Sequence, residues 1–167
     1  MNPMIKKFVD DGFMNETVGE KIQETIDSGN SLIIAGHRSA GTRPFFANIM
    51  AAAKKDNPAV QVKQAEDLEK EAKYYLIPAN PDQAAFEEVL FGAMKKEGVA
   101  FITLKEPEAP ISFLKLFKKM KKENVGQNKK FLQVECRKEN GVPYVDCVTE
   151  YYFGDDGKVL NEEIFKA

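Results

Sequence analysis

The chain has 167 residues, of which 43% are hydrophobic and 30% are charged, and its formal net charge is −2. This length and composition suit one domain with a complete core and exclude a disordered chain or a disulfide scaffold. The charge excludes a globally basic nucleic-acid binder. No apolar run approaches the roughly 20 residues that cross a bilayer, and residues 1–12 lack a signal-sequence pattern, so we expect a soluble, cytoplasmic protein.

The first third of the chain predicts a strand, a loop and a helix. A four-residue spacing of apolar side chains predicts a helix over residues 16–28. Residues 31–35 form a continuous apolar run, which is typical of a strand buried on both faces of a parallel sheet. After a loop with two glycines, apolar residues from Phe45 onward predict a helix that ends at about Lys55.

The rest of the chain continues the alternation and then changes to β structure. Strands are predicted over residues 59–63, 73–77 and 99–104, and helical segments over residues 65–72, 82–96 and 111–122. Alternating strands and helices indicate parallel βαβ units. Residues 131–136 and 142–153 flank a turn and predict an antiparallel hairpin. We therefore expect a single α/β domain over residues 1–167, a three-layer sandwich with a mainly parallel sheet and a C-terminal antiparallel β hairpin.

The loop after the first apolar strand has the glycine spacing of a phosphate-binding loop, G-x-x-x-x-G-K-[S/T]. Gly36 and Gly41 occupy the glycine positions, whereas Thr42 stands at the lysine position and Arg43 at the position of the magnesium-binding hydroxyl. Backbone N–H groups and the helix dipole can still hold an anion, but an arginine cannot hold a metal. The candidate anion-binding residues are Gly36, His37, Arg38, Ser39, Ala40, Gly41, Thr42 and Arg43.

Other interpretations of this loop stay open. It can be a plain connection between a strand and a helix, or Arg38 or Arg43 can replace the missing lysine as the cation. His37, the only histidine, is more often a surface residue than a base in such a position. No zinc site is expected, because the two cysteines are far from His37 in the sequence.

The acidic cluster, the basic stretch and the two cysteines can each be explained as structural features without a functional site. Glu66, Asp67 and Glu69 are interpreted as a solvated helical face. The basic stretch Lys118–Lys130 is expected to be the wet side of an amphipathic helix that carries Phe113, Leu114 and Phe117 on its other side. Cys136 and Cys147 flank a turn and can face each other across a hairpin, but two unpaired thiols are expected in a reducing cytosol.

In the order of its segments, nearly the whole chain resembles the C-terminal P-loop ATPase domain of the type II/IV secretion and pilus-assembly (twitching motility) ATPases, a bacterial family. The matching segments are Phe8–Gly12, Asn30–Ala53, the acidic Glu66-Asp67-Leu68, Lys105-Glu106-Pro107-Glu108-Ala109 beside the family's R-x-P-E-A, Gln133–Gly141, Val148–Glu150 and Gly157–Leu160. The resemblance implies a P-loop NTPase-like sandwich of the RecA type, without the family's N-terminal domain.

The chain departs from the family pattern at the residues that carry out catalysis in the family. The P-loop lysine and hydroxyl are replaced at Thr42 and Arg43, and the Walker B glutamate falls on Thr103. No histidine follows His37, so the family's histidine box is missing, and the arginine-bearing helix carries lysines instead.

The pattern of losses indicates a non-catalytic pseudo-ATPase that acts through protein contacts as an accessory or regulator of secretion or pilus machinery. Protein partners are expected, a homo-oligomer is compatible with the sequence, and nucleic acid is not expected. No cofactor is expected, although phosphate or a nucleotide anion without magnesium is compatible with the loop. The alternative is a residual nucleotide-binding protein or weak NTPase that uses Arg38 or Arg43.

Overall fold

The computed structural model describes all 167 residues. Its helices are Pro3–Asp10 (α1), Glu16–Asp27 (α2), Thr42–Asp56 (α3), Gln83–Lys95 (α4) and Phe113–Glu123 (α5), with short 3₁₀ turns at Arg38–Ala40 (η1) and Ala65–Glu69 (η2). Its strands are Ser31–Ala35 (β1), Ala59–Gln61 (β2), Tyr74–Ile77 (β3), Ala100–Lys105 (β4), Phe131–Glu139 (β5), Val142–Phe153 (β6) and Val159–Lys166 (β7).

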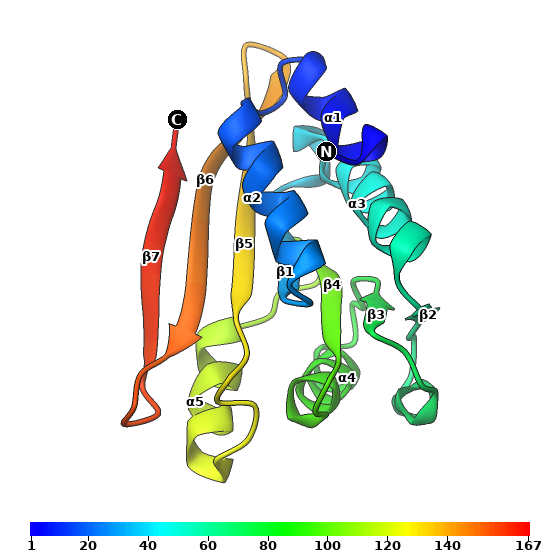
Figure 1. Ribbon diagram of the computed structural model, residues 1–167, viewed down its shortest axis with the longest axis vertical. Coiled ribbons are helices and arrows are strands. Elements are labelled where there is room, and N and C mark those ends of the chain that lie inside the picture. The colour runs from blue at the N-terminus through cyan, green and yellow to red at the C-terminus, as the bar shows by residue number, and fades with distance from the viewer.

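The strands form one mixed sheet in the order β2-β3-β4-β1-β5-β6-β7 (Figure 1). Strand β1 lies at its centre and pairs in parallel with β4 on one side and β5 on the other. Strands β6 and β7 extend the sheet in antiparallel fashion. The expected α/β class, the mainly parallel sheet and the C-terminal antiparallel hairpin are confirmed, and the hairpin is lengthened by a third strand.

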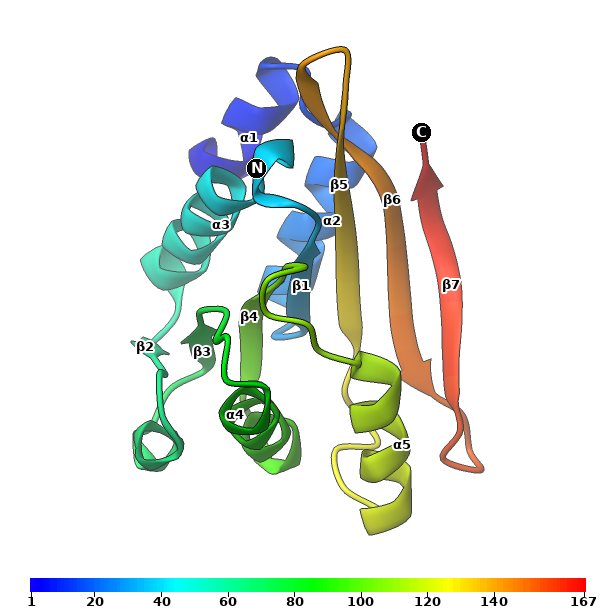
Figure 2. The same cartoon turned by 180° about the vertical axis from the view of Figure 1, so that it is seen from behind.

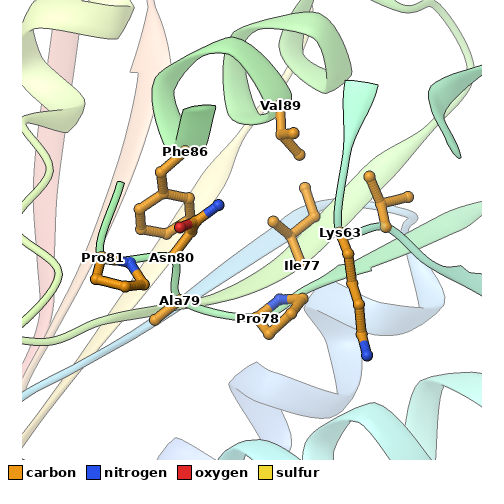
Figure 3. Close-up of a pocket in the computed structure, with 9 residues that line it drawn as sticks. Lys63, Ile77, Pro78, Ala79, Asn80, Pro81, Phe86 and Val89 are labelled. Atoms are coloured by element: carbon orange, nitrogen blue, oxygen red, sulfur yellow. The ribbon is translucent and has the colours of Figure 1, made fainter. Parts of the chain in front are cut away.

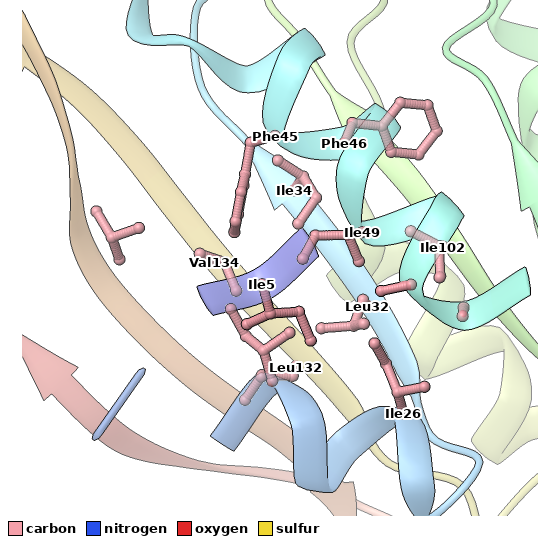
Figure 4. Packing of buried hydrophobic residues seen from close by; sticks show 14 of the residues in the cluster. Ile5, Ile26, Leu32, Ile34, Phe45, Phe46, Ile49, Ile102, Leu132 and Val134 are labelled. Carbon is pink, nitrogen blue, oxygen red and sulfur yellow. The ribbon is translucent and has the colours of Figure 1, made fainter. Parts of the chain in front are cut away.

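Helices cover both faces of the sheet, as expected for a three-layer sandwich (Figures 1 and 2). Because side chains alternate along a strand, Leu32 and Ile34 of β1 belong to one apolar cluster and Ile33 to the other. The first cluster packs under α1, α2 and α3, and Figure 4 shows Phe45, Ile49 and neighbouring side chains converging on the sheet there. The second packs under α4 and α5.

Two elements differ from the sequence prediction. Helix α1 was not predicted, although Asn2 caps it by accepting a hydrogen bond from the N–H of Met4. Residues 65–72 were expected to be helical, but only the 3₁₀ turn η2 forms. The carboxylate of Asp67 accepts hydrogen bonds from the N–H groups of Lys63 and Gln64, which fixes a tight turn in place of a longer helix.

The basic stretch forms the wet side of α5 only in part. Its lysines within the helix are exposed and Phe113 and Phe117 are buried, as expected, but Lys129 and Lys130 lie beyond the end of the helix. Leu114 is 53% exposed, so it lies outside the apolar side of α5 where it was expected. Lys129 points inward, and its ammonium donates to the carbonyls of Ala93 and Lys96 at the end of α4. Burial lowers the pKa of Lys129 to about 8, against an opposing effect of Glu97. This lysine therefore serves as a structural cap of α4.

The two cysteines are free thiols, as expected. They do not face each other, because Cys136 pairs with Val145 across the β5–β6 ladder while Cys147 pairs with Glu135. Burial raises the pKa of the Cys136 thiol to about 12, with a smaller contribution from Glu135. None of the helices is both long enough and apolar enough to cross a membrane.

Candidate functional site

The loop of residues 36–41 leaves the carboxyl end of β1 and leads into α3. The carboxyl ends of β4 and β5 lie on either side of it, because both strands run parallel to β1. Ligands of open α/β sheets usually bind at such an edge. The structure thus places all eight predicted anion-binding residues in the position where a phosphate loop would lie.

Gly36 is required by the close approach of β5. Its φ is 140°, and a Cβ atom added there would lie 2.5 Å from the carbonyl oxygen of Cys136. Its N–H donates to the carbonyl of Lys105, so it prolongs the pairing between β1 and β4. Strand packing accounts for this glycine without any ligand.

The N–H groups at the centre of the loop are used within the loop. The N–H of Ser39 donates to Nδ1 of His37 at 3.1 Å, and the N–H of Ala40 donates to the carbonyl of His37 at 2.9 Å. The N–H of Gly41 donates to the carbonyl of Arg38. In a phosphate-binding loop these groups would point at the anion. Here they close a 3₁₀ turn.

His37 holds the turn as an acceptor. Because Nδ1 receives the N–H of Ser39, and the hydroxyl of Ser39 lies 2.8 Å from the same nitrogen, the neutral ring carries its proton on Nε2. His37 therefore acts as the N-terminal cap of η1. A base needs a free nitrogen lone pair, but Nδ1 is engaged by Ser39 and Nε2 carries the proton in the neutral ring, so His37 has no lone pair to offer in this arrangement.

Arg43 is held by a carboxylate from the neighbouring strand end. Its Nε and Nη2 atoms donate to the two carboxylate oxygens of Glu106, each at 3.2 Å. Glu106 follows β4 directly and is only 4% exposed. Hydrogen bonds and charge from Glu106 raise the pKa of Arg43 further above its ordinary value. A two-pronged pair of this kind fixes both position and orientation of the guanidinium.

A second carboxylate faces the outer side of the loop. The Oε1 atom of Glu108 lies 3.8 Å from Nη2 of Arg38 and 3.6 Å from Nε2 of His37. All three side chains are about half exposed, so these contacts are weak in water. Together Glu106 and Glu108 place negative charge beside both arginines that could have replaced the missing lysine.

Thr42, at the lysine position, is completely buried. Its hydroxyl oxygen has no hydrogen-bond partner, which is unusual for a buried polar group. Its methyl group lies 3.2 Å from the position that a Cβ of Gly36 would take. Thr42 therefore packs beneath the loop and cannot reach an anion above it as a lysine would.

Two shallow hollows flank the loop. One, of about 430 Å³, lies toward β5, and its charged lining residues are Glu135, Arg137 and Lys138. The other, of about 330 Å³, lies toward the end of β4 and contains Glu106. Charges of both signs line this edge of the sheet, whereas a site for a di- or triphosphate needs a clear excess of cations.

A third hollow of about 210 Å³ lies at the carboxyl end of β3, away from the loop (Figure 3). Ile77, Phe86 and Val89 form its apolar wall, and the amide of Asn80 stands beside the ring of Phe86. Lys63 extends away from Phe86. Lys63 is the only ionisable residue that lines this hollow.

The other residues singled out in the sequence have structural contacts. Thr103, at the Walker B position, is buried and donates its hydroxyl to the carbonyl of Ile77 at 2.7 Å. The acidic cluster lies on η2, which packs against α4 and not against the loop. No group of three or more His, Cys, Asp or Glu side chains lies close enough to hold a metal ion.

Glu106 and Glu108 were not recognised from the sequence as residues of this site. They belong to the segment 105–109, which was noted only for its resemblance to R-x-P-E-A. The parallel pattern of the two apolar strands could have pointed to them, since neighbouring parallel strands end at the same edge of a sheet. No known protein-family model matches the chain, and no curated protein matches it in sequence.

The two loop glycines should respond differently to alanine. Gly36→Ala places a methyl group against the backbone of β5 and forces a residue other than glycine to φ 140°, so we expect a loss of about 3 kcal/mol in the free energy of unfolding. Gly41→Ala has room for the methyl group and strains only φ, 74°, so about 1 kcal/mol is expected. Urea unfolding followed by circular dichroism measures both.

The matched control is Gly98→Ala, which has a similar φ of 77° and open space around it. It should resemble Gly41→Ala. Equal losses in Gly36→Ala and Gly98→Ala would contradict the assignment of Gly36 to the close approach of β5.

Proposed function

We propose that this chain is a non-catalytic, cytoplasmic relative of the secretion and pilus-assembly ATPases that works through protein contacts, as an accessory or regulator of such a machine. The family part of this proposal rests on the order of segments and motifs in the sequence. The non-catalytic part rests on the geometry of the loop.

One observation carries the non-catalytic assignment: three of the loop N–H groups and the guanidinium of Arg43 are already bonded within the chain. Three consecutive loop N–H groups donate to His37 and Arg38, and Arg43 is bonded by both oxygens of Glu106. Binding a phosphate would require breaking these bonds and setting the anion beside two carboxylates. The cost of that rearrangement opposes binding.

The residues at the P-loop lysine position and at the Walker B position, Thr42 and Thr103, support the same proposal. Phosphoryl transfer depends on a cation and a metal that neutralise the developing charge. Thr42 is buried beneath the loop, and Thr103 donates to a backbone carbonyl. Neither side chain supplies the positive charge of a lysine or the carboxylate of a Walker B residue. The hydroxyl of Thr42 is of the kind that binds magnesium in a P-loop, but it is buried.

A residual nucleotide-binding protein is the second candidate, because one observation favours it. Arg38 is about half exposed, and Arg137 and Lys138 line the adjacent hollow. Arg137 pairs with Asp146 at 3.0 Å, so if Glu108 turned away, Arg38 and Lys138 would be the cations near the loop without a carboxylate partner. In that case the anion would bind without magnesium.

Calorimetric titration of the protein with ATP, ADP and inorganic phosphate separates the two candidates. For the unmodified chain we expect no heat of binding at millimolar ligand, with or without magnesium, and no release of phosphate from ATP. Glu106→Gln/Glu108→Gln removes both carboxylate charges, and we expect it to gain phosphate binding with a Kd of about 1 mM or tighter.

The control Glu87→Gln removes a carboxylate that pairs with Lys115 on the far side of the sheet from α3, and it should stay silent. Binding of ATP or phosphate by the unmodified chain at micromolar concentrations would contradict the proposal. Turnover of ATP that disappears in Arg43→Ala would establish the second candidate instead.

The regulatory part is tested on a purified pilus-assembly ATPase. We expect its rate of ATP hydrolysis to change when the chain is added in excess, and Gly98→Ala, which leaves the loop and exposed helical faces intact, should act like the unmodified chain. If the rate of ATP hydrolysis stays unchanged for both secretion and pilus ATPases, the proposed regulatory role is wrong. The non-catalytic assignment would not be affected by that result.

A further inference from the structure

The outer face of α5 carries a row of lysines that the chain itself does not neutralise. Lys118, Lys121 and Lys122 are exposed and take part in no ion pair. The neighbouring Lys115, by contrast, pairs with Glu87. Leu114 stands one turn before Lys118 and is 53% exposed, so the row begins with an apolar side chain. This face combines positive charge with one exposed apolar contact.

The outer face of α2 is its opposite in charge. Glu16, Glu20, Glu24 and Asp27 succeed one another at intervals of one turn and line a hollow of about 440 Å³. Only Glu24 pairs with a lysine, Lys21, at 3.6 Å. Met1 also lines the hollow, and its side chain lies against Gly19 of α2. The hollow therefore offers carboxylates and an apolar contact together.

The two faces match in spacing as well as in charge. Residues four apart on a helix are separated by about 6 Å along the axis. Lys118 and Lys122 of α5 follow this interval, as do Glu16, Glu20 and Glu24 of α2, so one helix can lie along the other with two pairs of opposite charges in register. Leu114 can meet the apolar side chain of Met1 in the hollow.

These faces cannot meet within one molecule. Helix α2 covers one face of the sheet, and α5 covers the other (Figures 1 and 2). A contact between them requires a second copy of the chain. In such a pair one copy keeps its α2 face unused and the other keeps its α5 face unused. Such a head-to-tail contact continues into a ring or a filament and does not close as a two-fold dimer.

We propose that the lysine face of α5 docks into the carboxylate-lined hollow on α2 of a second copy of this chain. Exposed ion pairs contribute little individually and are screened by salt. The assembly should accordingly be weak, reversible and favoured by low ionic strength. The contact does not involve the loop of residues 36–41, so this proposal does not depend on the proposed function.

Sedimentation velocity of the full chain over a range of concentrations tests the contact. In about 20 mM salt we expect species larger than a monomer that increase with concentration, and in about 500 mM salt we expect a monomer. Lys118→Glu/Lys122→Glu and Glu20→Lys/Asp27→Lys should each weaken association at least about five-fold. The matched control Lys54→Glu/Lys55→Glu reverses two exposed lysines of α3 and should associate like the unmodified chain.

Mixing the two reversed variants provides the decisive step. Each alone carries like charges on both faces, whereas in the mixture every face finds an opposite partner, so the large species should return. An unmodified chain that stays monomeric in low salt would overturn the proposal. So would a mixture that stays monomeric, or binding of phosphatidylserine vesicles through Lys118 and Lys122 without self-association.

Discussion

The bond between Arg43 and Glu106 joins the first turn of α3 to the residue that follows β4. A carboxylate that is 4% exposed needs a partner, because a buried charge without one is costly. Arg43 is the only cation bonded to it, and this holds the start of α3 against the edge of the sheet. Because the start of α3 is held there, the loop of residues 36–41 spans a fixed distance between β1 and α3. Within it, the N–H groups of Ser39, Ala40 and Gly41 donate to His37 and Arg38.

The loop keeps the glycine spacing of a phosphate-binding loop for reasons that belong to the fold. Gly36 avoids the backbone of β5, and Gly41 adopts the left-handed conformation from which α3 begins. The guanidinium groups of Arg38 and Arg43 face carboxylates, and three of the loop N–H groups donate to His37 and Arg38. Two surfaces with unneutralised charge lie away from this loop, on α2 and α5.

Continuous apolar runs and regular helical spacing predicted most of the fold. Residues 31–35 and 99–104 were recognised as buried strands because every side chain in them is apolar or small. Helix α1 was not predicted, although Ile5, Phe8 and Val9 follow helical spacing over its eight residues. The site was predicted only in part. The eight loop residues are contiguous, but Glu106 lies 63 residues after Arg43 and no local pattern joins them. The inward turn of Lys129 and the exposure of Leu114 likewise depend on packing that the sequence does not display.

The most direct test of whether the Arg43–Glu106 pair holds the start of α3 is a double-mutant cycle. It is measured by urea unfolding of Arg43→Ala, Glu106→Ala and the double variant. If the pair stabilises the start of α3, each single substitution leaves the other residue without its bond. The double variant should then lose less free energy of unfolding than the two single variants lose together. We expect a coupling free energy of at least about 1 kcal/mol between Arg43 and Glu106. Additive losses, with a coupling near zero, would contradict it.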